Sequence, residues 1–191
     1  MTGLLLKATD IAKLPVVGID SGDALAEVKD VVYSPEHGRV LGFTLNKRGF
    51  LRGPMRSVLP FEEAAVGRDA VMVRSAAALE HKRKDLSDDG SKGGVNVLGN
   101  EVLTDAGRRL GEVIDVVVEV RSGEVVGYEL QGDPDLQAHA GAPLLIPIPD
   151  TLAVSGSELM VPASAEPYIR DDLSGFGAAV TDFRAQLRQG R

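Results

Sequence analysis

Residues 16–45 read VVGIDSGDALAEVKDVVYSPEHGRVLGFTL, and residues 101–130 read EVLTDAGRRLGEVIDVVVEVRSGEVVGYEL. At this fixed offset of 85, thirteen of the thirty aligned positions are identical. A further match, between residues 71–73 and 159–161, follows at an offset of 88. Self-similarity at a fixed spacing is the signature of an internal repeat. We infer that the chain carries two copies of one small module.

Both copies have the pattern of short β-strands joined by tight turns. Their valine-rich runs are separated by turn signals such as Asp20-Ser21-Gly22, which supplies a glycine where the chain reverses. Gly42 and its counterpart Gly127 lie inside apolar strands, where a missing side chain is typical of a bulge or a tight bend. Such bends let a sheet close on itself. We therefore expect a mainly β protein with two tandem small β-barrels, and we favour closed barrels over an open sheet.

Composition divides the chain into four predicted parts. The segment between the copies is highly charged, then glycine-rich, and contains one isolated leucine, which predicts a linker. Near the C-terminus, four apolar residues at spacings of 4, 3 and 4 predict an amphipathic helix that starts near Ser174: Phe176, Val180, Phe183 and Leu187. The simpler expectation is that this helix docks on its own barrel, and the alternative is that it binds a partner. The predicted parts are a first barrel (1–80), a linker (81–94), a second barrel (95–168) and the helix (169–191).

The composition also narrows the function classes. The net charge of −7 has the wrong sign for a protein that binds nucleic acid by releasing counterions, so we expect no direct nucleic-acid binding. The absence of cysteine removes disulfides, thiol nucleophiles and cysteine metal sites. Near the N-terminus only residues 4–6 form a continuous apolar run, which fits neither a signal sequence nor a membrane span. We predict a cytoplasmic protein that is not an enzyme, and we assign no catalytic residue, no cofactor and no metal.

The repeated residues resemble the PRC-barrel family, which takes its name from the cytoplasmic domain of the photosynthetic reaction centre H subunit. The resemblance rests on residues 25–43 (LAEVKDVVYSPEHGRVLGF) and 58–73 (VLPFEEAAVGRDAVMV). A more divergent second copy is similar through residues 110–118 (LGEVIDVVV), 123–128 (GEVVGY) and 146–149 (IPIP). The resemblance implies small β-barrels that act as protein-binding or assembly modules and not as enzymes.

One loop of the first copy has the composition of a protein-binding site. Residues 47–56 hold four cations, no acid and three large apolar side chains between two strands. Arginine together with an aromatic residue is typical of interface hot spots. The alternative is a long hairpin tip whose Phe50 and Leu51 pack on the barrel. The candidate partner-binding residues are Lys47, Arg48, Phe50, Leu51, Arg52 and Arg56.

The two halves differ in charge. Residues 1–94 carry 14 basic and 13 acidic side chains, whereas residues 95–191 carry 7 and 15. This asymmetry suggests complementary packing, either between the barrels of one chain or between two chains in a homodimer.

The leading hypothesis is a non-catalytic adaptor or assembly protein whose two barrels pack together and bind an unidentified protein partner. A rival is a small-ligand-binding or catalytic domain with a site between the barrels that uses Asp30 or Asp115. The simpler interpretation of these carboxylates is that they accept backbone N–H groups at a bulge or a barrel rim. A third hypothesis is an RNA-metabolism or ribosome-related factor that acts through a protein partner.

Overall fold

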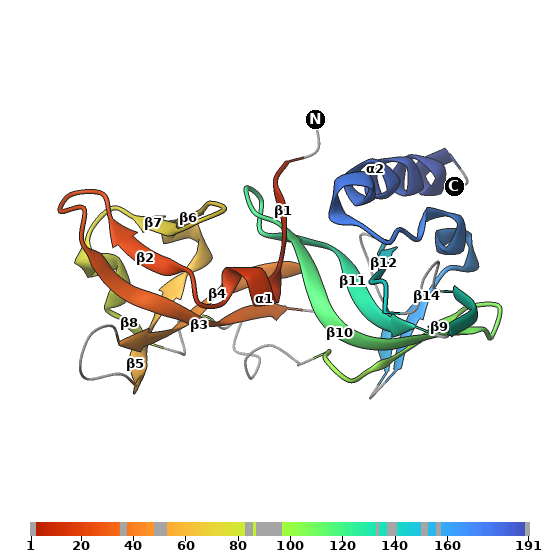
Figure 1. Cartoon of the computed structure of the whole chain (residues 1–191), viewed down its shortest axis with the longest axis horizontal. Coiled ribbons are helices and arrows are strands. Elements are labelled where there is room, and N and C mark those ends of the chain that lie inside the picture. The colour runs from red at the N-terminus through yellow and green to blue at the C-terminus, as the bar shows by residue number, and fades with distance from the viewer. Residues whose placement is uncertain are drawn as a thin grey trace.

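The protein forms two β-rich lobes that lie side by side along its long axis (Figure 1). The computed structural model describes residues 3–34, 38–47, 53–82, 86, 97–132, 134–136, 141–149, 153–155 and 158–189. Within these ranges fourteen strands belong to one hydrogen-bonded network, and neighbouring strands are mostly antiparallel. The mainly β prediction is confirmed.

The first repeat is built around two long strands, β3 and β4, which pair antiparallel. Its strands are β2 (Pro15–Gly18), β3 (Ala24–Ser34), β4 (Arg39–Lys47), β5 (Gly53–Pro60), β6 (Ala64–Val66), β7 (Val71–Val73) and β8 (His81–Lys82). Two short 3₁₀ helices cover Phe61–Glu63 and Ala76–Leu79. The turn between β2 and β3 contains Gly22 at φ +72, a left-handed conformation that favours glycine.

The second repeat has the same strand order. Its strands are β9 (Glu101–Thr104), β10 (Arg109–Glu119), β11 (Glu124–Gly132), β12 (Leu144–Pro147), β13 (Ala153–Ser155) and β14 (Glu158–Val161). In both repeats the first strand pairs parallel with a strand late in the module: β2 with β7, and β9 with β14. Short 3₁₀ helices cover Pro134–Leu136 and Ala163–Tyr168, and helix α2 spans Leu173–Gln189. The internal repeat in the sequence is therefore a repeat of topology.

The two glycines inside strands occupy equivalent irregularities. The β3–β4 register shifts just after the pair Val32↔Gly42, and the β10–β11 register shifts just after Val117↔Gly127. A bulge at this place is what the sequence predicts.

Each of these glycines also permits a close approach that a side chain would block. A Cβ at Gly42 would lie 2.3 Å from the carbonyl oxygen of Leu59 and 2.5 Å from the Leu86 side chain. A Cβ at Gly127 would lie 2.4 Å from the carbonyl oxygen of Ile146 and 2.4 Å from the Phe176 ring. Leu86, the isolated leucine between the repeats, is therefore buried against the first sheet much as Phe176 is buried against the second.

The expected closure into barrels is not seen among the described strands. Within the first repeat the order is β6-β7-β2-β3-β4-β5, and within the second it is β13-β14-β9-β10-β11-β12, with the ends of each series unpaired to one another. One end strand of each series has another partner instead. Strand β5 pairs with β8, and Leu145 in β12 forms a bridge with Arg170. These contacts occupy the edges that closure of each sheet would need.

Helix α2 docks on its own chain, in agreement with the simpler expectation. Phe176 and Phe183 are fully buried, and Val180 is also buried. The Phe183 ring lies 5.6 Å from the Tyr168 ring, centroid to centroid. The helix begins after Asp172, whose carboxylate accepts a hydrogen bond from the Gly175 amide at 2.8 Å and so caps the first turn.

The repeats meet through equivalent hairpin tips. Val40 N donates to Gly123 O at 2.7 Å, and Val125 N donates to Gly38 O at 2.7 Å. Val40 and Val125 are equivalent positions at the offset of 85, and so are Gly38 and Gly123. Each repeat therefore makes the same bond to the other, and the junction has a local pseudo-two-fold axis. The strand pair at its centre, Arg39↔Glu124, joins β4 to β11. An isologous contact of this kind is typical of homodimers, and here it lies within one chain.

The N-terminal segment crosses from the first repeat to the second. Strand β1 (Leu5–Lys7) pairs antiparallel with β10 at residues 117–119, and helix α1 (Ala8–Ile11) follows directly. Ile11 and Val97, at equivalent places before β2 and β9, are both buried. Most buried apolar side chains of both repeats form one continuous cluster. The two repeats therefore share one core that runs through both.

Candidate partner-binding site and buried carboxylate

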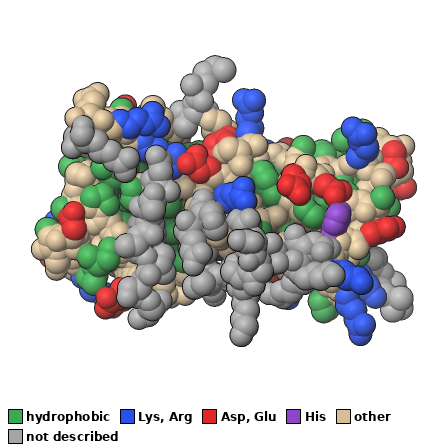
Figure 2. Space-filling model, turned by 180° about the vertical axis from the view of Figure 1, so that it is seen from behind, with side chains coloured by type: hydrophobic (Ala, Val, Ile, Leu, Met, Phe, Trp, Pro, Cys, Tyr) green, Lys and Arg blue, Asp and Glu red, His purple; other side chains and the backbone are tan. Residues whose placement is uncertain are grey.

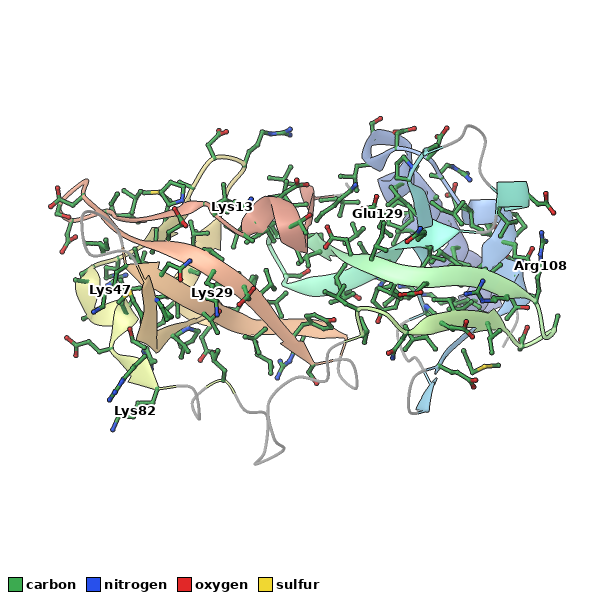
Figure 3. The ribbon with its side chains drawn as sticks, turned by 60° about the horizontal axis from the view of Figure 1, so that its bottom comes forward. Lys13, Lys29, Lys47, Lys82, Arg108 and Glu129 are labelled. Carbon is green, nitrogen blue, oxygen red and sulfur yellow. The ribbon has the colours of Figure 1, made fainter. Side chains whose placement is uncertain are left out.

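The candidate partner-binding loop connects two paired strands. Lys47 ends β4 opposite Gly53 at the start of β5, so residues 48–52 connect the two strands of a hairpin. Lys47 and Arg56 are exposed. Arg48, Phe50, Leu51 and Arg52 lie outside the described residues. Figure 3 shows Lys47 at the end of the first repeat that is farther from the second repeat.

The structure adds a basic residue that the candidate set omits. Strand β8 pairs with β5 through Ser57↔Lys82 and Val58↔His81, so Lys82 lies one strand away from Arg56. Lys82 is exposed, and it lies near the same end of the molecule as Lys47 (Figure 3). Three neighbouring strands thus each contribute one exposed cation. The basic run 82–84 is visible in the sequence, but its pairing with β5 is not.

The two equivalent aspartates have diverged in environment. Each follows a register shift, Asp30 in β3 and Asp115 in β10. Asp30 is exposed, and it accepts a hydrogen bond from Thr44 Oγ1 at 3.3 Å. Asp115 is only 4% exposed. Its carboxylate accepts the amide of Val116 at 2.8 Å, the amide of Thr9 at 3.4 Å, and the Thr9 hydroxyl.

Asp115 belongs to a polar cluster at the junction of the repeats. Burial raises the pKa of its carboxyl, the hydrogen bonds from Thr9 and Val116 lower it, and the neighbouring Glu129 carboxylate raises it, for a net increase. Lys7 in β1 pairs with Glu129 at 2.7 Å across the repeats. Thr9 and Lys7 both belong to the N-terminal segment, so Asp115 and Glu129 attach that segment to the second repeat. The interpretation of Asp115 as an acceptor of backbone N–H groups is confirmed.

A second buried polar contact joins the repeats nearby. The Tyr33 hydroxyl accepts a hydrogen bond from the Val97 amide at 3.1 Å in a buried setting. Burial raises the pKa of Tyr33 to about 12, so the phenol stays protonated at neutral pH. Both polar contacts are therefore satisfied parts of the junction.

Replacing Asp115 with asparagine should make the protein more stable relative to wild type as the pH rises. The folded-state pKa of Asp115 is raised, so its contribution to stability is fullest below the unfolded-state pKa and is lost as the pH rises through the folded-state pKa. The amide of Asp115→Asn can keep the Val116 and Thr9 contacts without a charge. Urea unfolding at several pH values measures the difference between the variant and wild type.

Two further variants control this prediction. Asp30→Asn changes the exposed carboxylate at the equivalent position and is the matched control for the burial of Asp115. Asp115→Ala leaves the Thr9 hydroxyl and Val116 amide without their acceptor, and should cost about 1–3 kcal/mol. A wild-type protein that gains stability over Asp115→Asn with rising pH would contradict the assigned role of burial.

The structure also contains a cavity of about 570 Å³, and neither aspartate lines it. It lies between the start of β1, the β10–β11 hairpin and helix α2. It therefore does not match the site between the barrels that the rival hypothesis places around Asp30 or Asp115.

Membrane-spanning helices, clusters of metal-ligating side chains and charged surface areas would each indicate a class of site in the described residues. Among them, no helix is both long and apolar enough to span a membrane. No cluster of three or more potential metal-ligating side chains occurs within the same residues. On the face in Figure 2, acidic and basic side chains are interspersed with small apolar areas.

Comparison with known proteins places these observations in a family. The PRC-barrel domain matches residues 5–80 and again residues 90–166. No curated protein matches the chain. The two family matches coincide with the two repeats of the structure. Because they cover well over half of the sequence, the chain belongs to the PRC-barrel family and carries two copies of its domain.

Proposed function

We propose that this tandem PRC-barrel protein is a non-catalytic adaptor that binds a protein partner through the β4–β5 hairpin. The contact set is Lys47, Arg48, Phe50, Leu51, Arg52 and Arg56, with Lys82 beside it. In this proposal the junction of the repeats is structural and the far end of the first repeat is functional. We place the adaptor in the cytoplasm, as the sequence predicts.

The observation that carries the proposal is the position of the hairpin. Lys47 is exposed at the end of the first repeat remote from the second (Figure 3), and Arg56 is exposed on the paired strand β5, whereas the junction carries satisfied hydrogen bonds and buried side chains. A cationic loop with an aromatic residue at such a place supports a protein interface, because arginine and aromatic side chains carry much of the free energy of binding in interfaces. The family resemblance to protein-binding modules supports the same function.

The test is affinity purification from the native host with three forms of the full-length protein. These are wild type, the variant Arg48→Ala/Phe50→Ala/Arg52→Ala, and the control Arg68→Ala/Arg74→Ala, whose two arginines are exposed elsewhere on the first repeat. We expect a protein retained by wild type and by the control to be lost from the triple variant, with little change in Tm. Quantitative mass spectrometry measures retention, and thermal unfolding measures Tm.

Two outcomes would contradict the proposal. Equal retention of every captured protein by wild type and the triple variant would exclude the hairpin as the binding site. A large loss of Tm in the triple variant would show that the hairpin is structural, with Phe50 packed on the sheet.

A further inference from the structure

The cavity of about 570 Å³ beside helix α2 has the size of a ligand site. The elements that line it are β1, the β10–β11 hairpin and α2, which all lie on the upper side of the molecule in Figure 1. Leu5, Val126 and Val180 supply an apolar part of the lining. Arg121, Arg184 and Arg188 supply a cationic part. The lining thus combines apolar contact with guanidinium groups.

These arginines are concentrated in an otherwise acidic half of the chain. Residues 95–191 contain seven basic and fifteen acidic side chains, and three of the seven line this cavity. Arginine presents a planar fork of donors that matches a carboxylate with two parallel hydrogen bonds. A cationic patch set in an acidic surface favours an anionic ligand at this point over its surroundings.

The two acids of the lining are engaged within the protein. Glu119 accepts hydrogen bonds from the Ser122 hydroxyl at 2.6 Å and the Ser122 amide at 2.8 Å. Glu124 pairs with Arg184 at 2.9 Å, and the Arg184 side chain is only 14% exposed. Arg121 and Arg188 both line the cavity and are exposed, and the charge of Arg121 helps to lower the pKa of the Glu119 carboxyl. The guanidinium groups best placed to meet an incoming ligand are therefore those of Arg121 and Arg188.

A strand edge completes the site. Leu4 O accepts the Val120 amide at 3.0 Å, and Leu6 pairs with Val118. In an antiparallel ladder alternate residues bond to the partner strand, so the backbone groups of Leu5 point away from β10. Leu5 lies in the wall of the cavity. An extended peptide can add to such an edge, with main-chain hydrogen bonds for affinity and side-chain contacts for specificity.

We infer that this cavity binds an extended acidic segment of a protein partner, whose carboxylates pair with Arg121 and Arg188 while its main chain adds to the outer edge of β1. Apolar side chains that alternate with the acids contact Val126 and Val180. This site is separate from the β4–β5 hairpin and gives the adaptor a second docking surface on the second repeat.

The test uses the full-length protein and a fluorescein-labelled peptide of seven residues in which glutamate and valine alternate. We expect saturable binding by fluorescence anisotropy. The double variant Arg121→Gln/Arg188→Gln should weaken this binding at least about tenfold, because two charge-assisted pairs are lost. The matched control Arg108→Gln/Arg109→Gln changes two exposed arginines of the same repeat, outside the cavity, and should bind as wild type.

Two further measurements distinguish strand addition at β1 from binding elsewhere on the molecule. Binding of the glutamate peptide should slow hydrogen exchange of the Leu5 amide, as strand addition requires. The hairpin variant Arg48→Ala/Phe50→Ala/Arg52→Ala should bind the peptide as wild type, so failure of the adaptor test and failure of this one are distinguishable.

Four results of these measurements would overturn the inference, and a competition experiment adds a fifth. They are no saturable binding of the glutamate peptide, equal binding of a lysine–valine peptide, equal weakening in the Arg108/Arg109 control, and no change at the Leu5 amide. The second and third would assign the signal to apolar contact or to general electrostatics. Competition by inorganic phosphate to the same extent as by unlabelled peptide would identify a small-anion site and would also overturn it.

Discussion

Replacing Phe183 with alanine should lower the free energy of unfolding by about 3–5 kcal/mol. Phe183 of helix α2 is fully buried, and its ring packs against the Tyr168 ring. Truncation removes the apolar contact and leaves a cavity between the helix and the segment beneath it. Since a domain of this size has a total stability of about 5–15 kcal/mol, the loss should be visible as a large fall in the urea midpoint.

A variant on the same helix provides the control. Thr181→Ala changes an exposed position whose hydroxyl bonds to the Gly177 carbonyl at 3.1 Å, and it should shift stability by less than about 1 kcal/mol. If Phe183→Ala and Thr181→Ala had equally small effects, helix α2 would not be docked as described, and the partner-binding alternative for this helix would regain support.

Gly123→Ala should destabilise the protein by clearly more than Gly107→Ala. Both glycines have left-handed backbones, with φ +74 and φ +79, so each substitution carries about 1–2 kcal/mol of conformational cost. A Cβ at Gly123 would also lie 2.7 Å from the Phe61 ring, whereas nothing lies within 4 Å of one at Gly107. Gly123 O accepts the Val40 amide, so the added strain falls directly on the junction of the repeats.

Urea unfolding measures the difference between these two variants, which we expect to be about 1–3 kcal/mol from overpacking alone. Hydrogen exchange locates it: the amides of Val40 and Val125 should lose protection in Gly123→Ala and keep it in Gly107→Ala. If the two variants were equally destabilised and both amides stayed protected, Phe61 and the hairpin tips would not stabilise the junction as described.

Much of each repeat follows from local sequence. The glycine that permits φ +72 at Gly22 has its counterpart at Gly107, and the bulges fall beside Gly42 and Gly127, where an apolar strand lacks a side chain. Helix α2 begins at Leu173, close to the predicted start. The spacing of its apolar residues predicts the face that is buried. These features depend on residues near one another in the chain, so pattern and period predict them.

Features that depend on contacts between the repeats could not be predicted in this way. Strand β1 pairs more than a hundred residues away on β10, and two leucines followed by a lysine carry no information about that partner. Asp30 and Asp115 look equivalent in the sequence, yet Thr9 reaches only Asp115 and so only that carboxylate is buried in the junction. The local pattern also could not predict that the sheets stay open. Strand β8 and Arg170 pair with the strand edges that closure would need, and both lie outside the repeated strands.

The candidate site could be predicted only in part from the sequence, because some of its residues come together through contacts between distant segments. A basic loop with an aromatic residue marks the β4–β5 hairpin in the sequence, but Lys82 joins its surroundings through the pairing of β8 with β5. The cavity on the second repeat combines the N-terminus, a hairpin and the C-terminal helix, which are far apart in the chain. No motif in any one of these segments indicates it.

Differential scanning calorimetry of the intact chain tests most directly the claim that the two PRC-barrel repeats form a single body. A continuous core, the reciprocal hydrogen bonds of Val40 and Val125, and the crossing of β1 predict one heat-absorption peak whose calorimetric and van't Hoff enthalpies agree. Two separate peaks, or a calorimetric enthalpy well above the van't Hoff value, would mean that the repeats unfold independently and would contradict it.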